Sequence, residues 1–152
     1  MKIVSACLVG INCRFNGKNK ANEKLVELFK KGILIPLCPE QLGGLPTPRP
    51  PCTIVGGDGH DVLKGKAKVL TRKGEDLTTY FVKGAHEVLA IAHLLDIKEA
   101  ILKSRSPSCG CGKIYCEDFT RKLRDGDGVT AALLKENGIK VYTERNFNCS
   151  DY

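Results

Sequence analysis

The sequence lacks any apolar stretch close to the roughly 20 residues that a membrane-spanning helix needs. It also lacks a secretory signal, because the apolar run in MKIVSACLVG is short and is soon interrupted at residues 12–14. With 42% hydrophobic and 27% charged residues among 152, the composition is that of one globular domain, long enough to bury roughly two-thirds of its unfolded surface. We therefore expect a soluble protein with a cytoplasmic location and no membrane partner.

No two cysteines are spaced as C-x-x-C, so the chain lacks the usual signature of a zinc ribbon or of a thioredoxin-like redox protein. Cysteines are nevertheless plentiful, with eight in the chain. A reducing cytosol keeps thiols free, and a domain of this length does not need disulfides to fold, so the cysteines indicate metal binding or catalysis. They stand at positions 7, 13, 38, 52, 109, 111, 116 and 149.

The positive charge is not gathered into a block, although the formal net charge is +7. The lysines are spread over helical and turn segments, which is typical of a solvated basic surface. A nucleic-acid partner remains possible from the net charge, but it is the less favoured interpretation of this pattern. The sequence does not indicate an oligomeric state.

Short apolar runs alternate with helical patterns along the chain, which predicts an α/β domain with a mostly parallel sheet and helices on both faces. A glycine-rich stretch over 53–71 predicts a small β excursion, and the five prolines between 39 and 51 predict a loop without a helix. We expect one domain over 1–146 and a flexible C-terminal tail over 147–152. The predicted strands are 2–6, 33–37, 99–103 and 139–143, and the predicted helices are 22–32, 75–95 and 126–138.

Three cysteines follow three of the predicted strands. Cys7 comes after the first strand, Cys38 directly after the second, and Cys109 a few residues after the third. Because ligands bind beyond the carboxyl ends of parallel strands, these three thiols are expected to converge at one edge of the sheet. Sulfur ligands select zinc, copper(I) or iron–sulfur centres, and Glu40 adds a carboxylate beside the same site.

The loop SRSPSCGCG, residues 104–112, fits one wall of such a site. Its glycines allow the backbone to approach a bulky group, and its serines offer hydroxyl donors. Any single cysteine can instead be a small buried apolar residue, and that interpretation stays open for Cys13 and Cys52. Cys111 and Cys116 can also act as substitute or additional ligands.

Two further motifs have alternative interpretations. The proline-rich PTPRPP either binds another protein as a polyproline segment or shapes the rim of the site, with Arg49 available for an anionic or carbonyl group. The segment GDGVT, residues 126–130, precedes a predicted helix whose N-terminus can bind phosphate, a weak signal when it stands alone.

Four motifs together resemble the 2-thiouracil desulfidase family, long described as a domain of unknown function. They are SACLVGINCRFNG, LCPEQLGGLPTPRPP, SPSCG and GDGVTAALLKENGIKVYTE, and the resemblance covers about residues 2–145. It implies a single Rossmann-like three-layer α/β domain in which Cys7, Cys38 and Cys109 hold a [4Fe–4S] cluster. The fourth iron is then free to bind the sulfur of a thiolated substrate.

The resemblance also implies a non-redox desulfuration of a thiolated pyrimidine or related small thiocarbonyl compound. Glu40 corresponds to the acid/base residue of the family, and the catalytic serine corresponds to Ser106, with Ser108 as the less favoured choice. A fourth ligand from Cys111 or Cys116 would close the cluster and stop the chemistry. Protein prepared in air would hold zinc or an empty site.

Two other functions remain alternatives to an iron–sulfur enzyme. One is a zinc- or cluster-bearing module that binds nucleic acid, including thiolated RNA, and it predicts affinity that falls steeply with salt. The other is a thiol redox or sulfur-carrier protein that uses Cys109 and Cys111, and it predicts a labile disulfide and no need for iron. The redox alternative is weaker because it gives Cys7 and Cys38 no role.

Overall fold

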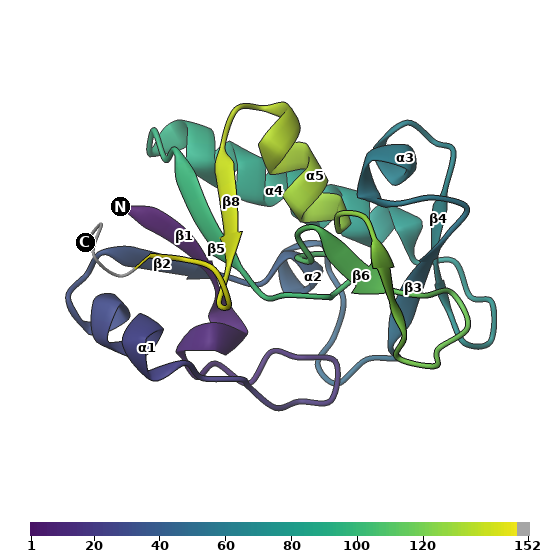
Figure 1. Ribbon diagram of the computed structural model, residues 1–152, viewed down its shortest axis with the longest axis horizontal. Coiled ribbons are helices and arrows are strands. Elements are labelled where there is room, and N and C mark those ends of the chain that lie inside the picture. Colours follow the sequence, from purple (N-terminus) through teal and green to yellow (C-terminus); the bar gives the residue numbers. More distant parts are fainter. Residues whose placement is uncertain (149–152) are drawn as a thin grey trace.

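A four-stranded parallel sheet forms the centre of the protein (Figure 1). The computed structural model describes residues 1–148. The strands run in the order β2 (Leu34–Leu37), β1 (Lys2–Ser5), β5 (Glu99–Leu102) and β8 (Lys140–Thr143), and every neighbouring pair is parallel. All four strands were predicted within one or two residues of their ends, and the parallel arrangement is confirmed.

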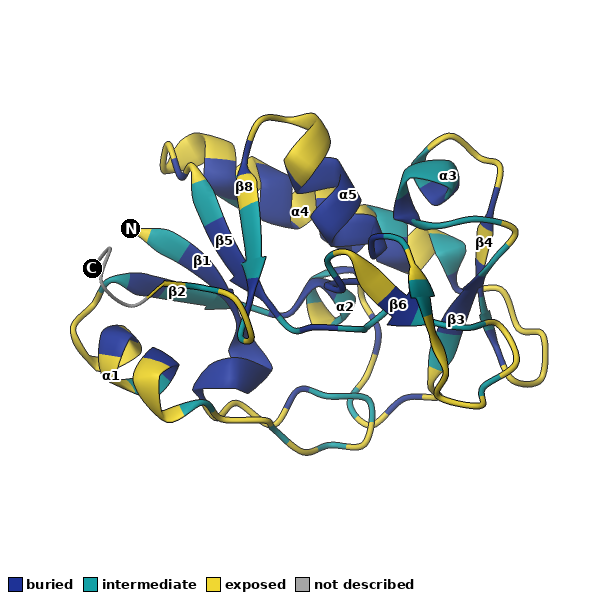
Figure 2. Cartoon of the chain, in the orientation of Figure 1, coloured by how far each residue is buried: buried dark blue, intermediate teal, exposed yellow. Residues whose placement is uncertain are grey.

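Helices cover both faces of this sheet. Helix α1 (Glu23–Lys30) lies on one face, and helices α4 (Thr78–Leu94) and α5 (Val129–Glu136) lie on the other (Figure 1). Neighbouring residues of β1 accordingly belong to different apolar clusters, Val4 to the one with α1 and Ile3 to the one with α4 and α5. Figure 2 shows the buried positions gathered along the strands and on the helix faces turned toward them. The predicted three-layer α/β fold is confirmed.

The long helix begins three residues later than predicted. Its expected first turn over 75–77 instead continues the pairing with β4 (Lys68–Thr71), in which Thr71 N donates to Glu75 O at 2.9 Å and Leu77 N donates to Val69 O at 2.9 Å. Hydrogen bonding to a neighbouring strand has therefore replaced the helical pattern that the apolar spacing predicted.

Two antiparallel hairpins project from the sheet. The predicted β excursion consists of β3 (Cys52–Val55) paired with β4, and the connection between them carries the short helix α3 (Gly59–Leu63). A second hairpin pairs β6 (Lys113–Tyr115) with β7 (Leu123–Asp125) and was not predicted. Both hairpins lie beyond the carboxyl ends of the parallel strands (Figure 1).

The prediction of a helix-free loop after β2 is wrong. Residues Pro39–Leu42 form the short helix α2, with Pro39 in its first turn, where the missing N–H group of proline costs nothing. This helix packs closely on α4 through two glycines. A Cβ atom on Gly43 would lie 2.0 Å from Tyr80 O, and one on Gly84 would lie 1.9 Å from Pro39 O.

The predicted tail over 147–152 falls partly outside the described residues, which end at residue 148. Within them, Phe147 packs against the apolar cluster that includes α1. The division into a domain over 1–146 and a tail stays a prediction. In the part of the chain that the structure describes, no helix has both the length and the hydropathy required to cross a membrane.

Candidate active site

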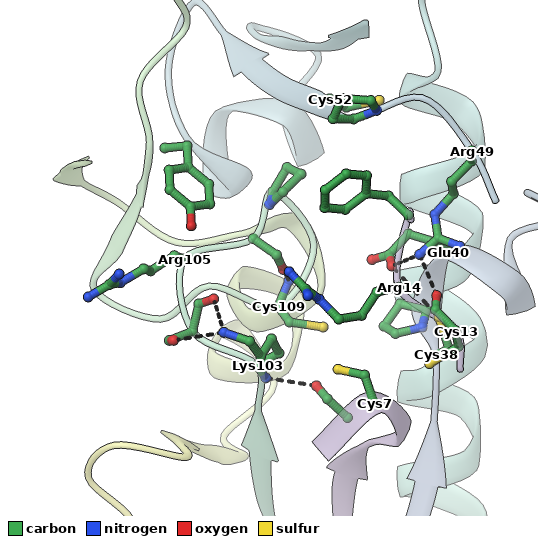
Figure 3. A pocket seen from close by; sticks show the side chains of 18 of the residues that line it. Cys7, Cys13, Arg14, Cys38, Glu40, Arg49, Cys52, Lys103, Arg105 and Cys109 are labelled. Carbon is green, nitrogen blue, oxygen red and sulfur yellow. Dashed lines mark hydrogen bonds and ion pairs between the residues drawn. The ribbon is translucent and has the colours of Figure 1, made fainter. Parts of the chain in front are cut away.

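The carboxyl ends of β1, β2 and β5 open into one cavity of about 430 Å³. Cys7 enters it from the 3-10 helix Ala6–Val9 after β1, Cys38 from the residue before α2, and Cys109 from the loop after β5. Figure 3 shows the three sulfur atoms turned toward the same space. All three side chains are buried, with exposed fractions of 7%, 8% and 4%.

A fourth thiol, that of Cys13, lines the same cavity. Cys13 is 2% exposed, and its thiol forms hydrogen bonds with those of Cys38 and Cys7. The bond with Cys38 lowers the pKa of Cys13, but the bond with Cys7 together with burial outweighs it and raises the pKa to about 11. Sequence analysis left Cys13 open because no predicted strand precedes it.

The thiols of Cys13, Cys38 and Cys109 have raised pKa values, which favours their protonated form in the absence of metal. The hydrogen bond that Cys38 makes with Cys13 is the largest cause that raises the pKa of Cys38, followed by burial and by the charge of Glu40. Burial is the largest cause that raises the pKa of Cys109, again with a contribution from Glu40. Since metals bind thiolates, loading of this site with a metal must release protons.

The cavity thiols are too far apart to bind one ion as they stand. Thiolates that share one zinc at about 2.3 Å lie within roughly 4 Å of one another. Among residues 1–148, the only group of three or more candidate ligand atoms within 4.8 Å of one another is Asp58, His60 and Asp127, outside the cavity. There Lys135 Nζ already lies 2.9 Å and 3.0 Å from the two Asp127 oxygens.

Glu40 is the one acidic residue that lines the cavity within the described range 1–148. It stands in the first turn of α2, and its Oε2 atom accepts hydrogen bonds from Arg49 Nη2 at 2.7 Å and from Cys38 Sγ at 3.7 Å. The expectation that Arg49 is available for an anionic group is wrong. Its side chain is 5% exposed and its guanidinium is used by the carboxylate of Glu40 and by backbone carbonyl groups.

The two candidate serines occupy different environments. Ser106 lines the cavity, and its Oγ atom accepts a hydrogen bond from Cys109 N at 2.8 Å, which leaves its own hydroxyl proton free to donate. Ser108 is fully buried, and its Oγ atom lies 3.0 Å from Thr130 Oγ1. Ser108 does not line the cavity, so its position fits support of the loop better than contact with substrate.

The N-terminus of α5 holds the cysteine loop and is not open to a phosphate group. Val129 N donates to Pro107 O at 2.8 Å, and Thr130 N donates to Ser108 O at 2.8 Å. A Cβ atom on Gly128 would lie 2.5 Å from the Ser108 backbone, so a glycine is required at this contact. The GDGVT motif therefore helps to position Cys109 through hydrogen bonds to the two residues that precede it.

The other end of the loop is fixed by Glu144, which follows β8. Its carboxylate accepts hydrogen bonds from Ser104 N at 2.8 Å, Ser104 Oγ at 2.5 Å and Lys103 Nζ at 3.0 Å. Burial alone would raise the pKa of Glu144, but the hydrogen bonds from Ser104 and the charge of Lys103 outweigh it and hold the pKa below its usual value. Glu144 thus keeps its charge and anchors the loop.

Neither Cys111 nor Cys116, the two candidates for an additional ligand, lines the cavity. The Sγ atom of Cys111 lies 3.6 Å from Val141 O, and the backbone N–H of Cys116 pairs with Lys122 across the β6–β7 hairpin. Cys52 does line the cavity, and burial raises its pKa to about 12. The thiol that joins the three predicted ones most closely is therefore that of Cys13.

Positive charge surrounds the cavity. Among residues 1–148, six of the lining cations have no carboxylate partner. Aromatic rings lie among them, with the guanidinium of Arg72 5.0 Å from the ring centre of Phe119 and that of Arg14 5.6 Å from Phe15. Sequence analysis missed this feature because its members come from five separate segments. The six cations are Arg14, Lys20, Arg72, Arg105, Arg121 and Arg145.

Comparisons with known proteins agree with this geometry. The family model of 2-thiouracil desulfurase matches residues 3–146. An uncharacterized protein of Bacillus subtilis (strain 168), YbbK, is 48% identical over 148 residues, which cover 97% of this chain and 98% of that protein. The solved structure of the [4Fe–4S]-dependent thiouracil desulfidase TudS is 40% identical and superposes with a TM-score of 0.84, covering 95% of this chain and 90% of that one. The resemblance carried by the four sequence motifs is thereby confirmed, and the chain belongs to the 2-thiouracil desulfurase family.

Proposed function

We propose that this enzyme removes the sulfur of a thiouracil-type pyrimidine without net redox change, with a [4Fe–4S] cluster held by Cys7, Cys38 and Cys109. Family membership supports the reaction, and the 40% identity to a [4Fe–4S]-dependent desulfidase supports the cofactor. The observation that carries the proposal is the meeting of three buried thiols from three strand ends in one cavity with the carboxylate of Glu40.

The donor set fits a cluster better than a single ion. Three thiols are soft ligands suited to iron–sulfur centres, and among residues 1–148 no three cavity thiols lie within 4.8 Å of one another, as one zinc ion would require. The cavity of about 430 Å³ also lies in the usual range for small-ligand sites. When bound by three protein ligands, the cluster supplies one open iron with Lewis acidity toward the thiocarbonyl sulfur.

The side chains around that position supply the proton transfers. Glu40 is the only carboxylate that lines the cavity among residues 1–148, and we assign it the removal of a proton from the water that attacks the thiocarbonyl carbon. Ser106 has a free hydroxyl proton, which we assign to a hydrogen bond with the substrate where negative charge develops. Water supplies the new carbonyl oxygen, the C–S bond breaks, and the sulfur leaves as hydrosulfide.

The charge around the cavity supports a substrate that carries an anionic group. Arg72, Arg121 and Arg145 lack carboxylate partners, and guanidinium groups bind phosphate oxygens in a bidentate manner. A thiolated pyrimidine nucleotide satisfies both the thiol-lined interior and the basic mouth, whereas free thiouracil satisfies only the interior. We therefore propose a phosphorylated thiopyrimidine as the preferred substrate.

Purification without oxygen, followed by iron and sulfide analysis and a desulfuration assay, tests the function. We expect about four irons and four sulfides per chain and release of sulfide from 2-thiouracil. Protein that remains colourless after reconstitution with iron and sulfide, or a loaded cluster that releases no sulfide from any thiopyrimidine, would refute the proposal. Glu40→Gln and Ser106→Ala are expected to keep the iron and lose turnover.

The substrate class has its own test. Arg72→Gln and Arg121→Gln are expected to raise KM for a thiouridine monophosphate by about tenfold each, since one ionic hydrogen bond contributes about 1.5 kcal/mol, while KM for free thiouracil stays the same. Equal KM changes for both compounds would contradict a phosphate contact. Competition by thiolated RNA that falls steeply with salt would favour a nucleic-acid strand as the substrate instead.

A further inference from the structure

Arg49 is a buried cation that joins three segments of the chain beside the thiols. Its Nη2 atom donates to Glu40 Oε2 at 2.7 Å and to Cys13 O at 2.8 Å, while Nη1 donates to Thr47 Oγ1 at 3.1 Å and to Pro46 O at 3.3 Å. Its side chain is only 5% exposed, so these bonds are shielded from water. The arrangement leaves little freedom for the guanidinium to move.

This arrangement treats the two oxygens of Glu40 differently. Oε2 is held by Arg49 and lies 3.7 Å from Cys38 Sγ, whereas Oε1 has no hydrogen-bond partner among residues 1–148. Because the Glu40 side chain is 15% exposed and lines the cavity, Oε1 is the oxygen left for proton transfer. A carboxylate held at one oxygen presents the other in a fixed direction.

The same contacts change in character when Cys38 binds metal. As a thiol, Cys38 donates to both Glu40 Oε2 and Cys13 O, at 3.7 Å in each case. A metal-bound thiolate has no proton to donate. Glu40 Oε2 and the Cys13 carbonyl oxygen then lose the hydrogen bond from Cys38 and keep the one from Arg49 Nη2. Arg49 also places a positive charge beside the carboxylate of Glu40, with Nη2 2.7 Å from Oε2.

We propose that Arg49 is a positioning residue, which fixes the proton-transfer oxygen of Glu40 relative to the cluster-binding thiols by tying the carboxylate to the Cys13 carbonyl. The role rests on the function proposed above, because it presumes that Glu40 moves the proton. It requires the fork of a guanidinium, since one nitrogen bonds Glu40 and Cys13 while the other is anchored by Pro46 and Thr47. A lysine supplies the charge but not this second anchor.

A double-mutant cycle on the cluster-loaded enzyme tests this role. We expect Arg49→Gln to lower kcat by about 100-fold through misplacement of Glu40, with KM changed by less than about threefold. In the Glu40→Gln background, Arg49→Gln is expected to lower kcat by less than about threefold, because no proton-transfer group remains to be positioned. Arg49→Lys is expected to fall between the wild type and Arg49→Gln.

Two readouts separate positioning from a merely structural contribution. Iron content is expected to stay at the wild-type level in all four proteins of the cycle. Hydrogen–deuterium exchange of peptides over 13–18 and 39–45, measured with and without the cluster, is expected to accelerate in Arg49→Gln but not in Glu40→Gln, whose amide oxygen still accepts from Arg49. Lys2→Gln, which removes an ion pair with Glu99 at the opposite end of β1, is the matched control and is expected to keep wild-type kcat.

A milder variant keeps the test informative if Arg49→Gln folds poorly. Thr47→Ala removes the Oγ1 atom that accepts from Arg49 Nη1 and leaves the Glu40 contact itself intact, and we expect kcat to fall by about fivefold. The proposal for Arg49 would be overturned if Arg49→Gln lowered kcat by the same factor with and without Glu40→Gln. It would also be overturned if the fall in kcat were explained by a fall in iron content. Wild-type kcat in Glu40→Gln would instead overturn the acid/base assignment of Glu40, whatever Arg49 does.

Discussion

Cys38 and Cys109 reach the same cavity by two different structural routes. Cys38 follows the last residue of β2 directly and is held by α2, which packs on α4 through two glycine contacts. Cys109 comes seven residues after β5, in a loop held at one end by Glu144 and at the other by the N-terminus of α5. One ligand is positioned by backbone continuity and close packing, and the other by hydrogen bonds from residues far away in the sequence.

The largest expected effect comes from replacing one of the cysteines proposed to hold the cluster. Alanine at Cys7, Cys38 or Cys109 is expected to abolish both iron retention and desulfuration, since in the proposed site each supplies one of three ligands. Iron analysis after anaerobic reconstitution measures this directly. Cys111→Ala, at a thiol outside the cavity, is the matched control and is expected to keep its iron. Wild-type iron content in any of the three ligand variants would show that the ligand set is wrong.

The position of Cys38 is expected to be disturbed by a change in the packing of α2 on α4. Gly84→Ala would bring a Cβ atom to 1.9 Å from Pro39 O, and α2 must then move away from α4. We expect a loss of about 3 kcal/mol in the free energy of unfolding, at the upper end for overpacking. Urea denaturation measures it, and Gly65→Ala, where φ is +75° and a Cβ meets nothing within 4 Å, shows the smaller cost of a strained backbone alone, about 1 kcal/mol. Similar losses in both variants would contradict the packing explanation.

The position of Cys109 is expected to be disturbed by loss of the hydrogen bond between Ser108 and Thr130. Thr130→Val keeps the shape of the side chain but leaves the buried Ser108 hydroxyl without its partner at 3.0 Å. We expect a loss of about 1–3 kcal/mol in the free energy of unfolding, the usual cost of an unsatisfied buried group. Activity should fall together with stability because the loop carries both Ser106 and Cys109. An unchanged melting temperature would mean that the backbone bonds to α5 suffice.

The smallest expected effect is a pH dependence behind the same loop. Burial alone would lower the pKa of His60, but hydrogen bonds with Asp127 and Glu136 raise it above its usual value near 6.5. A raised pKa in the folded state means that charged His60 stabilises the protein below about pH 6.5 and that this stability is lost as the pH rises through the folded-state pKa.

Because His60 is partly exposed and its pairs are screened, we expect this contribution to be under about 1 kcal/mol. Unfolding of the wild type and of His60→Gln should therefore differ most at pH 6 and converge above pH 8. Unfolding curves that stay parallel over this interval would exclude the ion pairs of His60 as a source of stability.

The same comparison explains which parts of the site the sequence could predict. Cys7 and Cys38 were predictable because each follows an apolar strand within two residues, so the strand rule alone places them. The choice between Ser106 and Ser108 was not, because it depends on Thr130, which lies 22 residues from Ser108. The strand rule also predicted that Cys109 reaches this edge of the sheet, but it did not predict the contacts with Glu144 and α5 that hold its loop.

The errors in the fold prediction have a related cause. The α2 helix was missed because prolines were taken to exclude helices, although Pro39 stands at the one position where proline is tolerated. Cys13 was left open because the segment that carries it is irregular and only tertiary contacts bring its thiol to Cys7 and Cys38. The pairing of Arg49 with Glu40 was equally hidden, since nothing in PTPRPP indicates that its arginine is buried.

The raised pKa values of the cavity thiols also determine how the protein behaves before it receives its metal. Thiolates react with oxidants and alkylating agents, whereas protonated thiols do so slowly. With the pKa of Cys13 at about 11 and those of Cys38 and Cys109 also raised, nearly all of these thiols stay protonated at neutral pH. In the unloaded protein these three thiols therefore react slowly with such agents, and an incoming metal must displace their protons before they bind it as thiolates.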